Sequence, residues 1–157
     1  FQYCTSLSNV TLPTSWGNVT NAYGMFQYCF SLRTINNLEY LGSTTTNADF
    51  TNFLQDAEAI SGTLTIASRL SKIGIYSSNT SAKLKCTGIR LTNANSTFTG
   101  SSPQVDVSYC SLDATALNTL FGDLPILTGK TIKITGNPGA STCDTSIATS
   151  KGWTVQN

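Results

Sequence analysis

Two short alternations of apolar and polar residues flank an amphipathic stretch between residues 103 and 137. Val105 and Val107 belong to the first alternation, and Ile132 and Ile134 belong to the second. A period of two predicts strands with one buried face. Between the two strands, apolar residues recur at helical spacing, at Leu117, Leu120, Phe121 and Leu124. The pattern therefore predicts strand, helix and strand.

The predicted helix has a start signal and a stop signal. Asp113 is a favourable N-cap residue, and Pro125 ends the helix because it lacks an amide hydrogen and clashes with the preceding turn. Weaker helical patterns predict a turn with a short helix over residues 18–29, a longer helix over 47–57 with Asn47 as N-cap, and a last helix over 144–151 with Gly152 as C-cap.

Residues 59–91 are rich in strand patterns. Strands are predicted at Thr63–Ile66, Leu70–Tyr76, Lys83–Cys86 and Ile89–Leu91. Ile73, Ile89 and Val105 follow one another at intervals of 16 residues, and Ile132 comes 27 residues after Val105. We therefore expect these residues to lie on successive strands of one sheet, with the longest return formed by the helix.

The chain begins with a repeat. FQYCTSL at residues 1–7 recurs as FQYCFSL at residues 26–32, which is a period of 25 residues. Short repeats of this length are typical of solenoids. We expect one domain over residues 1–157 that continues upstream of Phe1, because the chain opens within a repeat. Residues 138–157 are expected to form a C-terminal capping rung, in which Trp153 and Val155 cover the last apolar face.

The composition is polar but poor in charge. Charged residues make up 11% of the chain, the net charge is +1, and serine and threonine together number 44. A nearly neutral chain gives no electrostatic argument for binding nucleic acid, and no apolar run approaches the ~20 residues of a membrane span. We expect an extracellular protein, on a cell surface or a virion.

The sequence contains no histidine. This excludes catalytic triads that use histidine and the usual zinc sites of enzymes. A pair of cysteines at metal-binding spacing is also absent. We therefore expect a protein that is not an enzyme and has neither a cofactor nor a metal.

The five cysteines allow two interpretations. Cys4 and Cys29 hold the same position in successive repeats, so stacking would bring them near the separation that a disulfide requires. Cysteines in repeats are also commonly reduced and buried as small apolar residues. The odd number leaves at least one thiol without a partner in the chain.

The spacing Leu-x-x-Leu-x-Leu-x-x-Asn/Cys-x-Leu resembles the leucine-rich repeat. Val105, Val107, Cys110 and Leu112 fit this frame, and Ile132, Ile134 and Asn137 fit its centre. The stretch of Met25, Phe26, Cys29, Ser31 and Leu32 resembles the BspA-like subclass, which occurs in bacterial surface proteins and in phage virion or tail-fibre proteins. The resemblance implies an α/β solenoid with short parallel strands on its concave face and mixed loop and short-helix returns. It also implies adhesion or receptor binding through that face.

In this frame, the residue between the two apolar positions of each strand points outward on the concave face. Neighbouring strands lie about 4.8 Å apart, so Asp106 would lie between Arg90 and Lys133 in a ladder of charges. The candidate ligand-binding residues are Tyr76, Arg90, Thr92, Asp106, Ser108, Lys133 and Thr135. The alternative is that this row only stabilises the sheet through cross-strand pairs.

A run of basic residues without an intervening acid also has two interpretations. It consists of Arg69, Lys72, Lys83, Lys85 and Arg90, and it forms either a site for an anionic glycan or phosphate or a solvated face.

The leading hypothesis is a recognition or adhesion module whose partner is a protein or glycan receptor. The alternative is a structural virion decoration protein or filament subunit, which forms a homo-oligomer or a virion assembly through its rungs.

Overall fold

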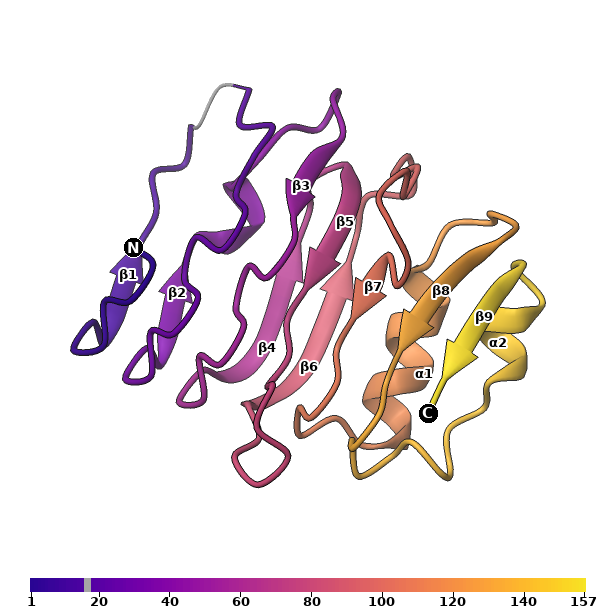
Figure 1. Ribbon diagram of the computed structural model, residues 1–157. Helices are drawn as coiled ribbons and strands as arrows, with labels where there is room; N and C mark the ends of the chain where they lie inside the picture. Colours follow the sequence, from indigo (N-terminus) through magenta and orange to yellow (C-terminus); the bar gives the residue numbers. More distant parts are fainter. Residues whose placement is uncertain (16–17) are drawn as a thin grey trace.

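The computed structural model describes residues 1–15 and 18–157. It is a mixed α/β fold with parallel sheets and few helices, and the described residues contain no closed barrel. From β3 onward, successive elements alternate between two layers that face each other (Figure 1). The two chain ends lie at opposite ends of this arrangement.

One layer is a five-stranded parallel sheet with the strand order β3-β5-β7-β8-β9. Its strands are β3 (Ala48–Phe50), β5 (Leu70–Gly74), β7 (Val105–Asp106), β8 (Lys130–Lys133) and β9 (Trp153–Gln156). The register places Asp106 opposite Gly74 on one side and opposite Lys133 on the other. An isolated bridge between Asn21 and Asp49 extends the sheet beyond β3.

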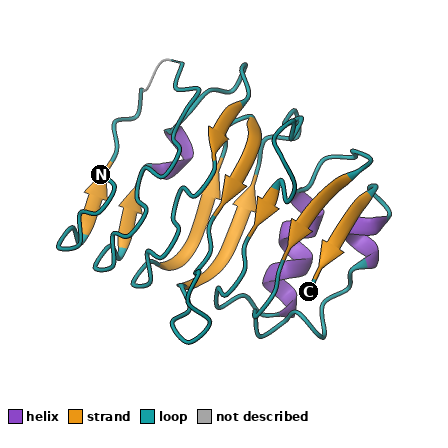
Figure 2. Cartoon of the chain, viewed as in Figure 1, coloured by secondary structure: helices purple, strands orange, loops and turns teal. Residues whose placement is uncertain are grey.

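The second layer contains the elements that lie between those strands in the chain. It begins with two parallel pairs, β1 (Asn9–Thr11) with β2 (Thr34–Asn36) and β4 (Ser61–Ile66) with β6 (Lys85–Leu91). The Ser61 amide donates to the Arg33 carbonyl at 3.2 Å and links the two pairs. The layer ends with helices α1 (Ala114–Asp123) and α2 (Ser146–Thr149), which lie at the end nearest β9 (Figure 2), and a short 3-10 helix, η1 (Leu38–Tyr40), follows β2.

The core lies between the two layers because the apolar residues of each strand point inward. Val105 and Ile132 are fully buried from the five-stranded sheet, and Ile66 and Cys86 are fully buried from the second layer. Removing this apolar surface from water is the main favourable contribution to folding. At the C-terminal end, the Trp153 ring packs edge-to-face against Phe98 at 5.1 Å and is 2% exposed.

The expectations for residues 103–137 are confirmed. Helix α1 spans Ala114–Asp123, and the Asp113 carboxylate accepts the Ala116 amide at 2.8 Å as its N-cap. Strands β7 and β8 flank the helix and pair with each other. The predicted helix over 144–151 is shorter, at Ser146–Thr149.

Two helical expectations are wrong. Residues 47–57 form strand β3 and a series of turns, and residues 18–29 form turns without a helix. The apolar residues at 50, 53, 54 and 57 are buried as predicted, but they are buried by parallel pairing with β5 and by the turn that follows β3. Between Lys85 and Leu91, the two predicted strands are one strand, β6.

The expected order of strands is also wrong. β6 pairs with β4, whereas β5 pairs with β3 and β7, so Ile89 does not lie between Ile73 and Val105. Each repeat contributes one element to each layer. The 16-residue intervals therefore connect elements in opposite layers, and β1 and β2 likewise do not belong to the five-stranded sheet.

The described structure contains no Cys4–Cys29 disulfide, because all five cysteines are free thiols. Cys4 is exposed, whereas Cys29, Cys86 and Cys110 are buried. Burial is the largest cause of the raised pKa values of the Cys29 and Cys110 thiols. These two cysteines are thus protonated donors at neutral pH.

Turns in four of the repeats share one backbone conformation. Tyr28, Asp56, Tyr109 and Gly136 all have a positive φ, between 52° and 74°. Backbone hydrogen bonds align these positions, because Tyr28 donates to Gln55 at 2.9 Å and Tyr109 donates to Thr135 at 2.8 Å. The only glycine among the four, Gly136, packs against the Tyr109 ring, which a side chain at residue 136 would overlap.

We predict that Gly136→Ala lowers the free energy of unfolding by about 1–3 kcal/mol, because alanine is strained at a φ of 74° and its methyl group meets the Tyr109 ring. The matched control is Gly122→Ala. Gly122 lies in α1 with open space around it, so alanine should raise the free energy of unfolding by roughly 0.5–1 kcal/mol. Urea denaturation of the three proteins measures both changes, and equal stabilities would contradict the described turn.

Candidate functional site

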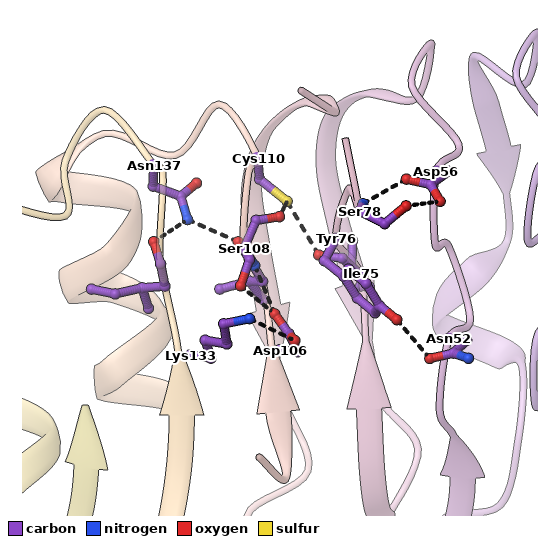
Figure 3. Close-up of polar contacts among 12 residues, drawn as sticks. Asn52, Asp56, Ile75, Tyr76, Ser78, Asp106, Ser108, Cys110, Lys133 and Asn137 are labelled. Atoms are coloured by element: carbon purple, nitrogen blue, oxygen red, sulfur yellow. Dashed lines mark hydrogen bonds and ion pairs between the residues drawn. The ribbon is translucent and has the colours of Figure 1, made fainter. Parts of the chain in front are cut away.

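A row of polar side chains crosses the outer face of the five-stranded sheet where its strands end (Figure 3). Tyr76 follows β5, Asp106 ends β7, and Lys133 ends β8. Asp106 and Lys133 are register partners, and the Lys133 ammonium lies 4.0 Å from the Asp106 carboxylate. The prediction that Asp106 and Lys133 lie side by side on neighbouring strands is confirmed. We call Tyr76, Asp106 and Lys133, together with Asn52, the strand-end row.

Tyr76 is positioned by its contacts with Gly74 and Asn52. A side chain at residue 74 would come within 3.1 Å of the Tyr76 ring and 2.9 Å of the Asn52 amide nitrogen, so glycine gives the ring room to lie over β5. The Tyr76 hydroxyl donates to the Asn52 side-chain oxygen at 2.9 Å. The side-chain amide nitrogen of Asn52 donates in turn to the Tyr23 hydroxyl at 3.3 Å. The row thus extends across β3 to an exposed aromatic ring.

The Asp106 carboxylate is held in place from its own strand. It accepts the Ser108 amide at 3.0 Å and the Ser108 hydroxyl at 2.5 Å, and its side chain is 15% exposed. At 4.0 Å the contact with Lys133 is longer than a hydrogen bond, and the Lys133 side chain is 38% exposed. The ammonium therefore lies beside a fixed carboxylate while its hydrogens stay accessible to another acceptor.

Several predicted members of the site have other places in the structure. Ser108 is 1% exposed and supports Asp106 from within, so it does not face outward as expected. Thr135 is half-buried, and its carbonyl accepts the Tyr109 amide. Arg90 and Thr92 belong to the second layer, in or next to β6, and do not join Asp106. Their expected place in the row is wrong.

Arg90 forms a structural ion pair instead. Its guanidinium donates two hydrogen bonds to the Asp123 carboxylate, at 2.6 and 3.0 Å, and the Leu91 amide donates to the same carboxylate at 3.1 Å. Asp123 ends α1, where a negative charge is unfavourable beside the helix carbonyls. Arg90 compensates for that charge and ties β6 to the helix.

The basic run does not form one surface. Lys72 lies on β5 and donates to Ser101 at 2.9 Å, Lys85 is exposed on β6, and Arg69 lies in the loop before β5. Arg90 is bound to Asp123. Of the two interpretations of this run, a site for an anionic glycan or phosphate shared by all five residues is therefore wrong.

No sequence signal points to Asn52, which lies within the predicted helix over residues 47–57. Asp56 lies in the turn after β3. It is 4% exposed and accepts the Ser78 amide and hydroxyl, each at 2.6 Å, and the Ser77 hydroxyl at 3.2 Å. These donors satisfy the carboxylate, so Asp56 joins the turn after β3 to the turn after β5.

Among the described residues, no group of three or more metal-binding side chains lies close enough to hold an ion. None of the helices in the described part of the chain has the length and apolar character that a membrane crossing requires. No protein-family model, curated protein or solved structure gives a significant match to the chain. The proposals below therefore rest on its own geometry.

We predict that the Tyr76 phenol loses its proton at a higher pH than an ordinary tyrosine does. Burial, followed by the negative charges of Asp106 and Asp56, raises the pKa of its phenol to about 12. Between pH 10 and 12 the unfolded chain loses this proton while the folded chain keeps it, so the free energy of unfolding falls as pH rises through that window. Tyr76→Phe, which removes the titrating group, should show a smaller fall between pH 10 and 12 in urea denaturation. A fall as steep as that of the wild type would contradict the described surroundings of Tyr76.

Proposed function

We propose that this protein is a non-enzymatic recognition module that binds a protein or glycan on a cell or virion surface through the strand-end row. The observation that carries the proposal is the alignment of the Tyr76 ring, the Asp106 carboxylate and the Lys133 ammonium at the ends of three neighbouring strands. Together they offer an apolar surface, a hydrogen-bond acceptor and a donor to one ligand. Hydrogen bonds to Ser108 and Asn52 hold Asp106 and Tyr76 in place, which reduces the entropy lost on binding.

We further propose that the fold is a leucine-rich-repeat solenoid that resembles the BspA-like subclass. Side chains at equivalent positions after the turns support this. The Cys29 thiol donates to the Phe1 carbonyl at 3.0 Å, the Cys110 thiol donates to the Ile75 carbonyl at 3.2 Å, and the Asn137 amide donates to the Val107 carbonyl at 2.8 Å. Each acceptor belongs to the preceding repeat. In the resemblance, Cys110 and Asn137 occupy the Asn/Cys position and Cys29 belongs to the BspA-like stretch, and binding uses the strand face.

The equivalence of Cys29, Cys110 and Asn137 predicts which residues can replace Asn137. Asn137→Ala removes donors to the Val107 and Ile134 carbonyls and the acceptor of the Leu112 amide, so it should lower the free energy of unfolding by roughly 2–4 kcal/mol. Asn137→Cys should be less destabilising, because a thiol fills the equivalent position at Cys29 and Cys110. Chemical denaturation tests the pair, and a cysteine variant no more stable than the alanine variant would contradict the equivalence.

The binding proposal is tested with Lys133→Ala and Asp106→Asn. We expect each to weaken retention on glycan arrays or whole cells by about tenfold or more, because charge-assisted hydrogen bonds are lost. Stability should change by less than about 1 kcal/mol for Lys133→Ala, since its ion pair is long and partly exposed.

Thr11→Ala and Asn36→Ala are the matched controls, because these residues are exposed on β1 and β2 in the second layer. They should bind like the wild type. If the row variants also bind like the wild type but lose stability, the row only stabilises the sheet, and the proposal fails.

One observation favours the alternative, a structural decoration protein or filament subunit. Large exposed aromatic residues occur in the N-terminal repeats, at Phe1, Tyr3, Tyr23, Phe30 and Tyr40. At this end the Tyr3 and Tyr28 rings stack at 4.8 Å, and the Phe1 and Phe26 rings stack at 5.4 Å. A subunit of this kind would associate through its ends, and substitutions in the strand-end row would leave that assembly intact.

A further inference from the structure

A second concave surface lies away from the strand-end row, among the loops that connect the two layers. It is a hollow of about 920 Å³ whose walls are residues 44–45, residues 94–97 and residues 122–127, with Arg69 and Lys151 at its margin. We call it the loop hollow. Its walls come from three different repeats, so its shape depends on how those repeats stack.

Most charges around the loop hollow are already neutralised or bound. Asp123 is bound by Arg90 and by the Leu91 amide. The Lys151 ammonium donates to three carbonyls after or within the last turn of α1, those of Phe121, Gly122 and Leu124. These contacts fix the wall formed by residues 122–127, and they leave neither Asp123 nor Lys151 as an available partner for a ligand.

Arg69 differs from these two residues. Its Nε donates to the Asn47 side-chain oxygen at 3.1 Å, and Nη1 donates to the Thr45 carbonyl at 3.0 Å. A guanidinium has five N–H donors, so three remain without a partner among the described residues. They belong to the two terminal nitrogens, which form the fork that binds a carboxylate through two parallel hydrogen bonds. The two existing bonds already restrict the side chain.

The remaining lining is both apolar and rich in neutral polar groups. Ile126 is 80% exposed, which is unusual for an isoleucine. Thr44, Thr45 and Asn95 are exposed on the opposite walls. A sugar ring presents C–H groups on its faces and hydroxyls around its edge, so it matches this combination of aliphatic contact and neutral hydrogen bonding.

We propose that the loop hollow binds an acidic saccharide, with a sugar carboxylate on Arg69 and a ring face on Ile126. This site is separate from the strand-end row. An acidic peptide is disfavoured because peptides often bind by adding a strand to a free edge, and the walls of the hollow are mostly loops.

Arg69 also has a structural contact that the experiment must separate from binding. Its guanidinium holds the turn at residues 45–47. Arg69→Ala therefore removes both the charge and a brace. Ile126→Ser changes the proposed contact surface without a loss of packing, because the Ile126 side chain is almost fully exposed.

The experiment is a calorimetric and NMR titration of the chain with tri-galacturonate, with its trimethyl ester and with tri-glutamate. We expect tri-galacturonate to bind saturably. Its ester should bind about tenfold more weakly or worse, because it has lost the charge. Tri-glutamate should not bind saturably. Amide shifts should be confined to residues around the loop hollow.

The variants locate the site. Arg69→Ala and Ile126→Ser should each weaken tri-galacturonate binding, the first by about tenfold or more. Arg69→Lys should recover only part of the affinity, since an ammonium lacks the fork. Arg33→Ala removes an exposed arginine from the second layer and should bind within twofold of the wild type.

Four results would overturn the proposal. They are equal affinity for acid and ester, tri-glutamate binding as tight as that of tri-galacturonate, no saturable binding of tri-galacturonate, and unchanged affinity in both Arg69→Ala and Ile126→Ser. If Arg69→Ala fails to fold, the comparison of acid with ester and the Ile126→Ser variant decide the outcome. Failure here would leave the strand-end row untouched, because Lys133→Ala tests that surface separately.

Discussion

The rest of the structure depends on the hydrogen bonds that stack the turns of successive repeats along one edge of the five-stranded sheet. At Tyr28, Tyr109 and Gly136 a positive φ reverses the chain, and the residue after each directs a thiol or amide donor at a carbonyl of the preceding repeat. Tyr28, Asp56 and Tyr109 adopt this conformation although they are not glycines, which has an energetic cost. Backbone bonds between repeats offset that cost. Because the turn fixes where each strand stops, it also fixes the register that brings Asp106 beside Lys133.

The stacking of repeats leaves some charged side chains engaged within the protein and others with hydrogen-bond donors that remain available. Arg90 is paired with the Asp123 carboxylate, which neutralises its charge, and the Lys151 ammonium donates to three carbonyls at the end of α1, so both side chains stabilise the helix. Lys133 and Arg69 keep donors that the described residues do not use. In a chain with 11% charged residues, such unused donors are few. This difference, and not the mere presence of charge, is why the strand-end row and the loop hollow are proposed as binding surfaces.

The sequence predicted the region from 103 to 137 well because its signals are local. Asp113 is an N-cap, Pro125 follows the helix, and the strands on either side alternate cleanly. The adjacency of Asp106 and Lys133 followed from the 27-residue spacing of their strands. At 47–57 the apolar spacing also suits a helix, but pairing of β3 with β5 outweighs this local preference. Asn52 could not be found because its role depends on that pairing.

The place of Arg90 could not be read from local pattern either. The alternations at Leu70–Ile75 and at Cys86–Leu91 look alike, yet β5 and β6 lie in different layers. Alternation reveals that one face of a strand is buried, but not which sheet the strand joins. Only pairing between distant residues decides this, and it gives Arg90 the partner Asp123, 33 residues away.

The protein is proposed to be a recognition module and not a subunit that assembles with copies of itself. Light scattering of the purified chain over a concentration series tests this most directly. The account predicts a mass of 16.7 kDa at every concentration, because the proposed surfaces bind other molecules and not copies of this chain. A mass that increases with concentration, or a defined oligomer, would contradict the account. The exposed aromatic residues of the N-terminal repeats would then be the surface that matters.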